Sequence, residues 1–74
     1  MPKYDLVRVD SNAYSIMGYV QRAMKTEHCS KEEIDAYLKD AKSSDYNHLL
    51  ITSIEIIEKL NFKRLIEGKD EEYE

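Results

Sequence analysis

The clearest structural signal in this chain is Ser30-Lys31-Glu32-Glu33-Ile34, which has the pattern of a capping box. In a capping box the Ser30 hydroxyl accepts a hydrogen bond from the Glu33 amide, while the Glu33 carboxylate accepts one from the Ser30 amide. Cys29 and Ile34 occupy the two positions of a hydrophobic staple across the same helix start. A helix is therefore predicted to begin directly after Ser30.

A second amphipathic pattern lies on the N-terminal side of this start. Asp10, Ser11 and Asn12 are three candidate N-caps in a row. Gly18 interrupts the helix that follows and costs about 1 kcal/mol relative to alanine, so we expect another helix to cross closely there. The apolar residues that follow the candidate caps at helical spacing are Ala13, Ile16, Met17, Val20, Ala23 and Met24.

A third helix is predicted after Ser44 or Asp45, either of which can cap it. Ile51 and Ile56 widen its apolar face, which predicts a helix that is covered on more than one side or that dimerises. Residues 62–66 either extend this helix or form a short strand. The residues assigned to its main apolar side are Leu49, Leu50, Ile54, Ile57 and Leu60.

The N-terminal residues 4–9 alternate in the manner of a short β-strand. A single strand leaves its backbone donors and acceptors unpaired, so we expect it to pair with residues 62–66 or with a second copy of the chain. Residues 1–67 are predicted to form one helical domain, and residues 68–74 an acidic, frayed tail. The predicted fold class is mainly α, a small three-helix domain with a short N-terminal strand.

The composition limits the classes of protein that this chain can belong to. Its 74 residues are 42% hydrophobic and 35% charged, with a formal net charge of −4, which suits one small core and no interdomain cleft. Neither a membrane helix nor a signal-peptide core is present in the sequence. The single cysteine excludes a disulfide framework and favours a reducing, cytoplasmic location.

Few residues could carry chemistry. The imidazole and thiol groups are those of His28, Cys29 and His48, and their spacing is not that of a metal site, so we expect neither metal nor cofactor. A nucleophilic pair of Cys29 and His48 is formally possible, because a cysteine before a helix start has a lowered pKa. Nothing marks an oxyanion hole, and a chain this short leaves little room for a pocket. We expect no enzymatic activity.

A cluster of hydrogen-bonding side chains, Asp45-Tyr46-Asn47-His48, occupies one helical turn. One interpretation is a recognition surface that Asn12 and Arg22 complete. The other interpretation is local: Asp45 caps the helix, and His48, three residues later, is its capping partner. The surplus of tyrosine is typical of interfaces, and Tyr14 lies beside the main apolar stripe of its helix. The candidate interaction residues are Asn12, Tyr14, Arg22, Asp45, Tyr46 and His48.

Direct nucleic-acid binding is disfavoured by the charge distribution. A recognition helix needs Arg, Lys, Asn or Gln in its N-terminal half, whereas residues 31–35 read Lys-Glu-Glu-Ile-Asp and would repel phosphate. The acidic excess of residues 30–74 leaves open a regulator that is linked to nucleic acid or mimics its charge.

Several blocks together resemble a family of short bacterial and phage-borne proteins with no assigned activity. The blocks are residues 10–18 (Asp-Ser-Asn-Ala-Tyr-Ser-Ile-Met-Gly), 22–25 (Arg-Ala-Met-Lys) and 44–50 (Ser-Asp-Tyr-Asn-His-Leu-Leu). The resemblance spans residues 10–60 and implies an accessory protein of a mobile element, but no catalytic residue.

The predicted function is a non-enzymatic interaction module that binds a protein partner and self-associates. The unpaired strand, the broad apolar face of the third helix and the surplus tyrosine all favour association. A buried charge at position 54 is expected to unfold the domain. The predicted core consists of Ile16, Met17, Val20, Met24, Ile34, Leu38, Leu50, Ile54 and Ile57.

Overall fold

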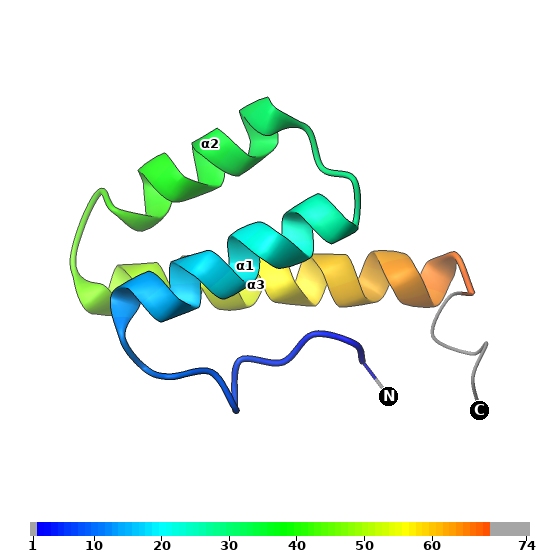
Figure 1. Cartoon of the computed structure of the whole chain (residues 1–74), viewed down its shortest axis with the longest axis horizontal. Coiled ribbons are helices and arrows are strands. Elements are labelled where there is room, and N and C mark those ends of the chain that lie inside the picture. Colours follow the sequence, from blue (N-terminus) through cyan, green and yellow to red (C-terminus); the bar gives the residue numbers. More distant parts are fainter. Residues whose placement is uncertain (1, 69–74) are drawn as a thin grey trace.

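The computed structural model describes residues 2–68, which form three helices, so the prediction of a mainly α fold with three helices is confirmed. The helices are α1 (Ala13–Thr26), α2 (Lys31–Ala41) and α3 (Tyr46–Ile66). The long α3 runs along the longest axis of the molecule, and the shorter α1 and α2 pack against it and against each other (Figure 1). No helix in this part of the chain combines the length and the apolar character needed to cross a membrane.

Each helix begins where a polar side chain satisfies its first amide groups. The capping box at α2 is present, with 3.1 Å from the Glu33 amide to Ser30 Oγ and 2.8 Å from the Ser30 amide to Glu33 Oε1. The hydrogen bond from the Ser30 amide lowers the pKa of the Glu33 carboxyl. Asn12 caps α1 and Asp45 caps α3 through their side-chain oxygens. The cap at Ser30 is as predicted, and of the alternatives left open for the other two helices the structure uses Asn12 and Asp45.

The end of α1 is a Schellman turn with a histidine in the left-handed position. The Cys29 amide donates to the Met24 carbonyl at 2.9 Å, and the His28 amide donates to the Lys25 carbonyl at 3.0 Å. His28 has a φ of 66°, a conformation that usually falls to glycine. This turn reverses the chain and directs α2 back across α1.

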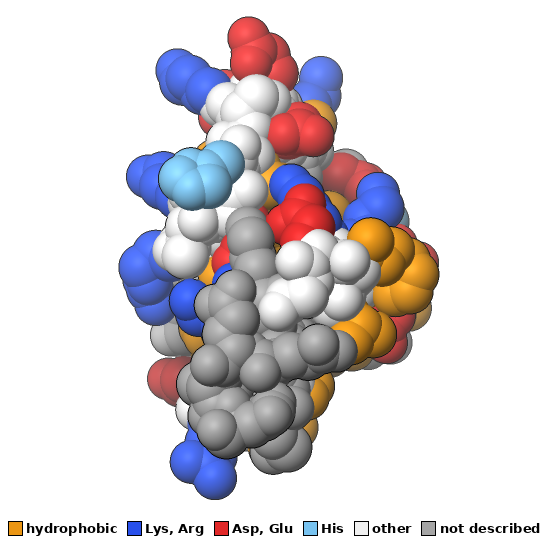
Figure 2. All heavy atoms as spheres, turned by 90° about the vertical axis from the view of Figure 1, so that its right-hand side faces the viewer, with side chains coloured by type: hydrophobic (Ala, Val, Ile, Leu, Met, Phe, Trp, Pro, Cys, Tyr) orange, Lys and Arg blue, Asp and Glu red, His pale blue; other side chains and the backbone are white. Residues whose placement is uncertain are grey.

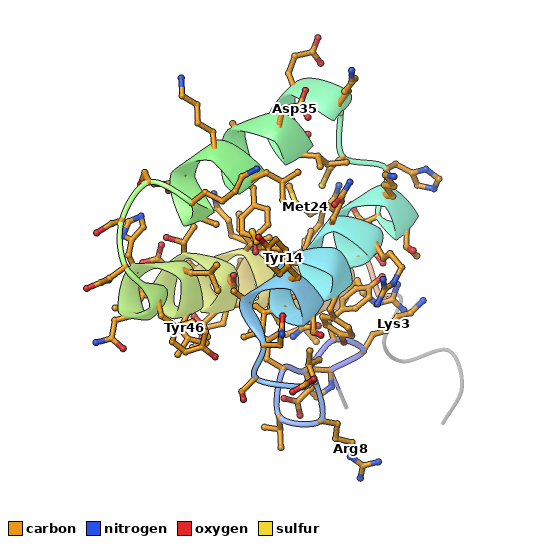
Figure 3. The ribbon with its side chains drawn as sticks, turned by 60° about the vertical axis from the view of Figure 1, so that its left-hand side comes forward. Lys3, Arg8, Tyr14, Met24, Asp35 and Tyr46 are labelled. Carbon is orange, nitrogen blue, oxygen red and sulfur yellow. The ribbon has the colours of Figure 1, made fainter. Side chains whose placement is uncertain are left out.

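One hydrophobic core joins all three helices and the N-terminal segment. Six of the predicted core residues are buried: Ile16, Met17, Val20, Met24, Ile34 and Ile57. Met24 points inward between α1 and α2 (Figure 3). Leu38 and Leu50 are partly buried and pack against the core. The core also contains residues that were not predicted as its members: Tyr4, Ala23, Tyr37, Ala41, Leu49 and Leu60.

The assignment of Ile54 to the core was wrong, because its side chain is 44% exposed. Helix α3 is turned so that Leu49, Ser53 and Ile57 face inward, and Ser53 is completely buried. With Ile54 on the outside, an aspartate at this position would be solvated and would not unfold the domain.

Gly18 does not mark a helix crossing, and that prediction was wrong. A Cβ atom built at Gly18 would meet only Nη1 of Arg22, one turn further along the same helix, at 3.5 Å. The glycine therefore lies where a larger side chain could be accommodated.

The N-terminal segment is not assigned as a strand in the described structure, and the expected strand at residues 4–9 stays a prediction. Residues 2–68 contain no strand, and residues 6–9 form a turn closed by the bond from the Val9 amide to the Leu6 carbonyl, 3.0 Å long. Residues 62–66 belong to α3, so they offer no strand edge for pairing. Pairing of residues 4–9 with a second chain stays a prediction. Residues 69–74 of the predicted acidic tail lie outside the described residues.

Candidate functional site

The outward side of α3 carries an exposed row of apolar side chains, which we call the α3 outer row. Phe62 is 62% exposed, and its neighbours on this side are similarly open to solvent. Hydrophobic side chains gather along one edge of the face shown in Figure 2, whereas Lys and Arg line the opposite edge. Glu55 and Glu58 separate its two apolar groups. Because exposed large apolar residues gathered on one side of a helix mark association sites, this row is the first candidate surface. Its members are Ile51, Ile54, Phe62, Leu65 and Ile66.

A groove of about 890 Å³ runs between α2 and α3, and we call it the α2–α3 groove. Its apolar lining comes from Ala36, Tyr37, Ile56 and Phe62. Tyr37 is buried, and its hydroxyl shares a hydrogen bond of 2.6 Å with Ser53 Oγ, so this part of the floor is fixed. Burial raises the pKa of the Tyr37 phenol. The charged residues of the lining are Glu33, Asp40, Glu55, Glu58 and Lys59.

The inward side of the C-terminal half of α3 holds a buried ionic cluster. Glu27 is 3% exposed at the end of α1, and Nη1 of Arg64 donates to Glu27 Oε2 at 3.0 Å. The Tyr4 hydroxyl donates to the same carboxylate oxygen at 2.5 Å. Burial and this hydrogen bond raise the pKa of the Tyr4 phenol far above its usual range. The cluster therefore ties the N-terminal segment and α1 to α3.

Two further contacts hold the N-terminal segment against the helices. Asn61 brackets the backbone of Tyr4, accepting from its amide at 3.0 Å and donating to its carbonyl at 2.8 Å. The Asp5 amide donates to the hydroxyl of Tyr19 at 2.9 Å. These side chains satisfy backbone groups that a strand partner would otherwise satisfy, which is why the segment can lie on the helices without a sheet.

The predicted polar cluster 45–48 is partly explained by local contacts. Asp45 caps α3, accepting from the His48 amide at 3.0 Å. His48 turns toward α2, where its Nε2 lies 3.0 Å from Asp40 Oδ1. The hydrogen bond to Asp40 raises the pKa of the His48 imidazole. Tyr46 donates from its hydroxyl to the Ser11 carbonyl and so joins the start of α3 to the start of α1.

The structure brings only some of the candidate interaction residues together. Tyr14, Asp45 and Tyr46 line a shallow hollow of about 290 Å³ between the starts of α1 and α3. Figure 3 shows Tyr14 and Tyr46 on these two helices, and Tyr14 is 81% exposed. Asn12 is used as the α1 cap, and Arg22 is not among the residues that line the hollow. An interaction role for these residues stays a prediction.

The alternative of a Cys29–His48 nucleophilic pair is not supported by the geometry. Figure 1 places the α1–α2 connection, which contains Cys29, and the start of α3, which contains His48, at opposite ends of the molecule. Burial raises the pKa of the Cys29 thiol, which is opposite to what an activated thiolate needs. Among residues 2–68, no three His, Cys, Asp or Glu side chains converge to hold a metal ion.

Comparison with models of protein families, with curated proteins and with solved structures finds no match for this chain. The resemblance to phage-borne proteins therefore stays a prediction.

Proposed function

We propose that this protein is a non-enzymatic interaction module that self-associates through the α3 outer row. The observation that carries the proposal is the exposure of that row, which includes Phe62 and the three residues Ile51, Leu65 and Ile66 on a helix whose inward side is already covered. Leaving such side chains in water costs free energy that a second copy can recover.

The charges of α3 favour an antiparallel arrangement of two copies. If the two helices cross between Glu58 and Lys59, each Glu58 lies opposite the partner's Lys59 and each Ile51 lies opposite the partner's Ile66. Opposite charges at the centre and apolar residues at both ends are the pattern of a self-complementary twofold interface. A parallel arrangement would instead place like carboxylates side by side.

The size of the row suits a weak or modest dimer. Its five apolar side chains expose on the order of 500 Å² per chain, against about 800 Å² per partner in a standard interface. Flanking parts of α3 would supply the remainder, so we expect dissociation in the micromolar range.

Sedimentation and light scattering over a range of chain concentrations test this proposal. We expect a dimer that dissociates on dilution, and we expect Ile51→Glu or Leu65→Glu to give a monomer at every concentration. The matched control is Val7→Glu, which also places a carboxylate on an exposed apolar position but lies outside α3. A wild-type chain that is monomeric throughout, or a Val7→Glu variant that dissociates equally, would overturn the proposal.

A second candidate function is a regulator that occupies a basic nucleic-acid-binding surface by mimicking its charge. It is supported by the carboxylates of the α2–α3 groove, where Glu33, Asp40, Glu55 and Glu58 outnumber the single Lys59. Competition between this chain and duplex DNA for a polylysine surface tests it. No displacement of DNA at low salt would end this alternative.

The accessory role in a mobile element belongs to the same proposal and is supported only by the sequence resemblance. The neighbouring genes test it directly. A setting without phage or mobile-element genes would contradict it.

A further inference from the structure

We propose that the α2–α3 groove binds an amphipathic helix of a partner protein that carries lysine or arginine on both flanks of an apolar stripe. The inference deepens the proposed function, because it names a partner class for an interaction module. The groove overlaps the α3 outer row at Phe62 and at the Glu58–Lys59 pair, so a partner helix and a second copy of the chain are expected to compete.

The shape of the groove fits a helix. On α3 the lining extends from Thr52 to Phe62, ten residues along the helix or about 15 Å, which equals about three helical turns. On α2 it extends from Glu33 to Asp40. The residues that line the groove belong to α2 and α3 alone, so α1 does not close it. An additional helix laid in this groove would give a four-helix packing of the usual kind.

The floor of the groove provides the apolar contact. Phe62 is exposed at one end, Ile56 is partly buried in the middle, and Ala36 is an exposed small residue that lets another helix approach α2. Buried Tyr37 has its hydroxyl satisfied by Ser53, so covering the floor leaves no orphan donor there. The apolar stripe of the partner is expected to lie on these residues.

The rims of the groove determine the charge of the partner. Glu33 and Asp40 lie on the α2 side, and Glu55 and Glu58 lie on the α3 side. The hydrogen bonds to Ser30 lower the pKa of the Glu33 carboxyl most, and the charges of Lys63 and Lys59 add to this, so the positive charge of Lys59 is partly offset by Glu33. Both rims therefore attract cations, and an acidic helix of the same shape would be repelled.

Fluorescence anisotropy with a synthetic leucine–lysine peptide of helical pattern and about four turns tests the proposal on the full chain. We expect saturable binding that weakens as the salt concentration rises. A scrambled peptide of the same composition controls for charge alone, and a leucine–glutamate peptide of the same pattern controls for the apolar stripe alone. Both controls are expected to bind at least tenfold more weakly.

Two pairs of matched variants locate the site. Glu55→Gln with Glu58→Gln should weaken peptide binding roughly fivefold, as expected for two exposed charge pairs. Glu32→Gln with Asp35→Asn removes the same charge from exposed positions of α2 that do not line the groove, and Asp35 points away from the body of the molecule (Figure 3). This control should bind as wild type does.

The apolar pair is Phe62→Ala, expected to weaken binding about tenfold, and Ile51→Ala, which lies outside the groove and should bind unchanged. Equal binding by the two charge variants, equal binding by the two apolar variants, or equal binding of the scrambled peptide would overturn the proposal. A chain that dimerises but fails to bind the peptide refutes the groove alone. A chain that binds the peptide but is monomeric at every concentration without it refutes only the self-association.

Discussion

The two sides of α3 both depart in part from the usual burial of apolar residues, although Leu49, Ile57 and Leu60 are buried on the inward side. The inward side contains Ser53 and Arg64 among its covered residues, whereas the outward side exposes Ile51, Phe62 and Ile66. The inward polar groups are accommodated because each has a partner from another element, either a hydrogen bond or an ion pair. The outward apolar side chains stay exposed and are not buried by any other part of residues 2–68. The inward side therefore stabilises the fold, and the exposed outward side is the one on which the proposed association depends.

The largest loss of stability is expected from removing the charge of Arg64 on the inward side of α3. Arg64→Leu would leave the Glu27 carboxylate buried without its guanidinium, which costs about 3–5 kcal/mol of unfolding free energy. Since small domains have a total stability of about 5 kcal/mol or more, urea denaturation should show a much lower midpoint.

Two further variants serve as controls for this experiment. Tyr4→Phe removes only one hydrogen bond to Glu27 and should cost about 1.5–3 kcal/mol. Lys63→Leu alters an exposed neighbour on α3 and should change stability by less than about 0.5 kcal/mol. An Arg64→Leu midpoint equal to that of Lys63→Leu would show that the buried pair does not stabilise the fold.

Two isoleucines on α3 give the most direct contrast between its sides. Ile57 is buried and Ile54 is 44% exposed, so Ile57→Ala should cost about 2–4 kcal/mol. Ile54→Ala should cost less than about 0.5 kcal/mol in the monomer. Chemical denaturation at low chain concentration measures both. Equal losses would mean that the outward side is also packed.

A smaller effect is expected at the buried hydroxyl pair. Ser53→Ala leaves the Tyr37 hydroxyl buried without its partner, at a cost of about 1–3 kcal/mol. Adding Tyr37→Phe should recover part of that loss, because an apolar pair has no group to satisfy. A double-mutant cycle gives the coupling energy. If Tyr37→Phe lowered the stability of the Ser53→Ala variant further, the lost hydrogen bond would not explain the effect of Ser53→Ala.

These features also explain what the sequence could predict. The caps at Ser30, Asn12 and Asp45 are local, so the sequence predicted the start of α2 and narrowed the starts of α1 and α3 to a few neighbouring residues. The orientation of α3 about its own axis depends on contacts with the other helices, which no local pattern shows. Its leucines and isoleucines occur on both sides, so hydrophobicity alone predicted that Ile54 faces inward. In the structure Ser53 faces inward instead, where it is hydrogen-bonded to Tyr37.

The ionic cluster was missed for a related reason. Tyr4, Glu27 and Arg64 come from three separate parts of the chain, and each residue alone has the pattern of an ordinary surface position. The one available signal was Asn61, an amide side chain between Leu60 and Phe62, which the structure uses to bracket the Tyr4 backbone. The acidic rims of the groove could not be predicted for the same reason, because their carboxylates belong to α2 and α3 and are brought together only by folding.

The smallest expected effect is a pH dependence at the start of α3. The hydrogen bond to Asp40 raises the pKa of His48 in the folded chain above its ordinary value of about 6.5. The stability from this pair is therefore fully present below pH of about 6.5 and is lost as the pH rises through the raised folded pKa. Asp40→Asn should move the His48 pKa back toward its ordinary value in an NMR titration, with His28→Gln in both chains so that one imidazole signal is followed. Because the pair is exposed, added salt should also reduce the shift in wild type. A His48 pKa that is the same with and without the Asp40 carboxylate would assign the shift to the Asp45 cap instead, and the connection between α2 and the start of α3 would then rest on packing alone.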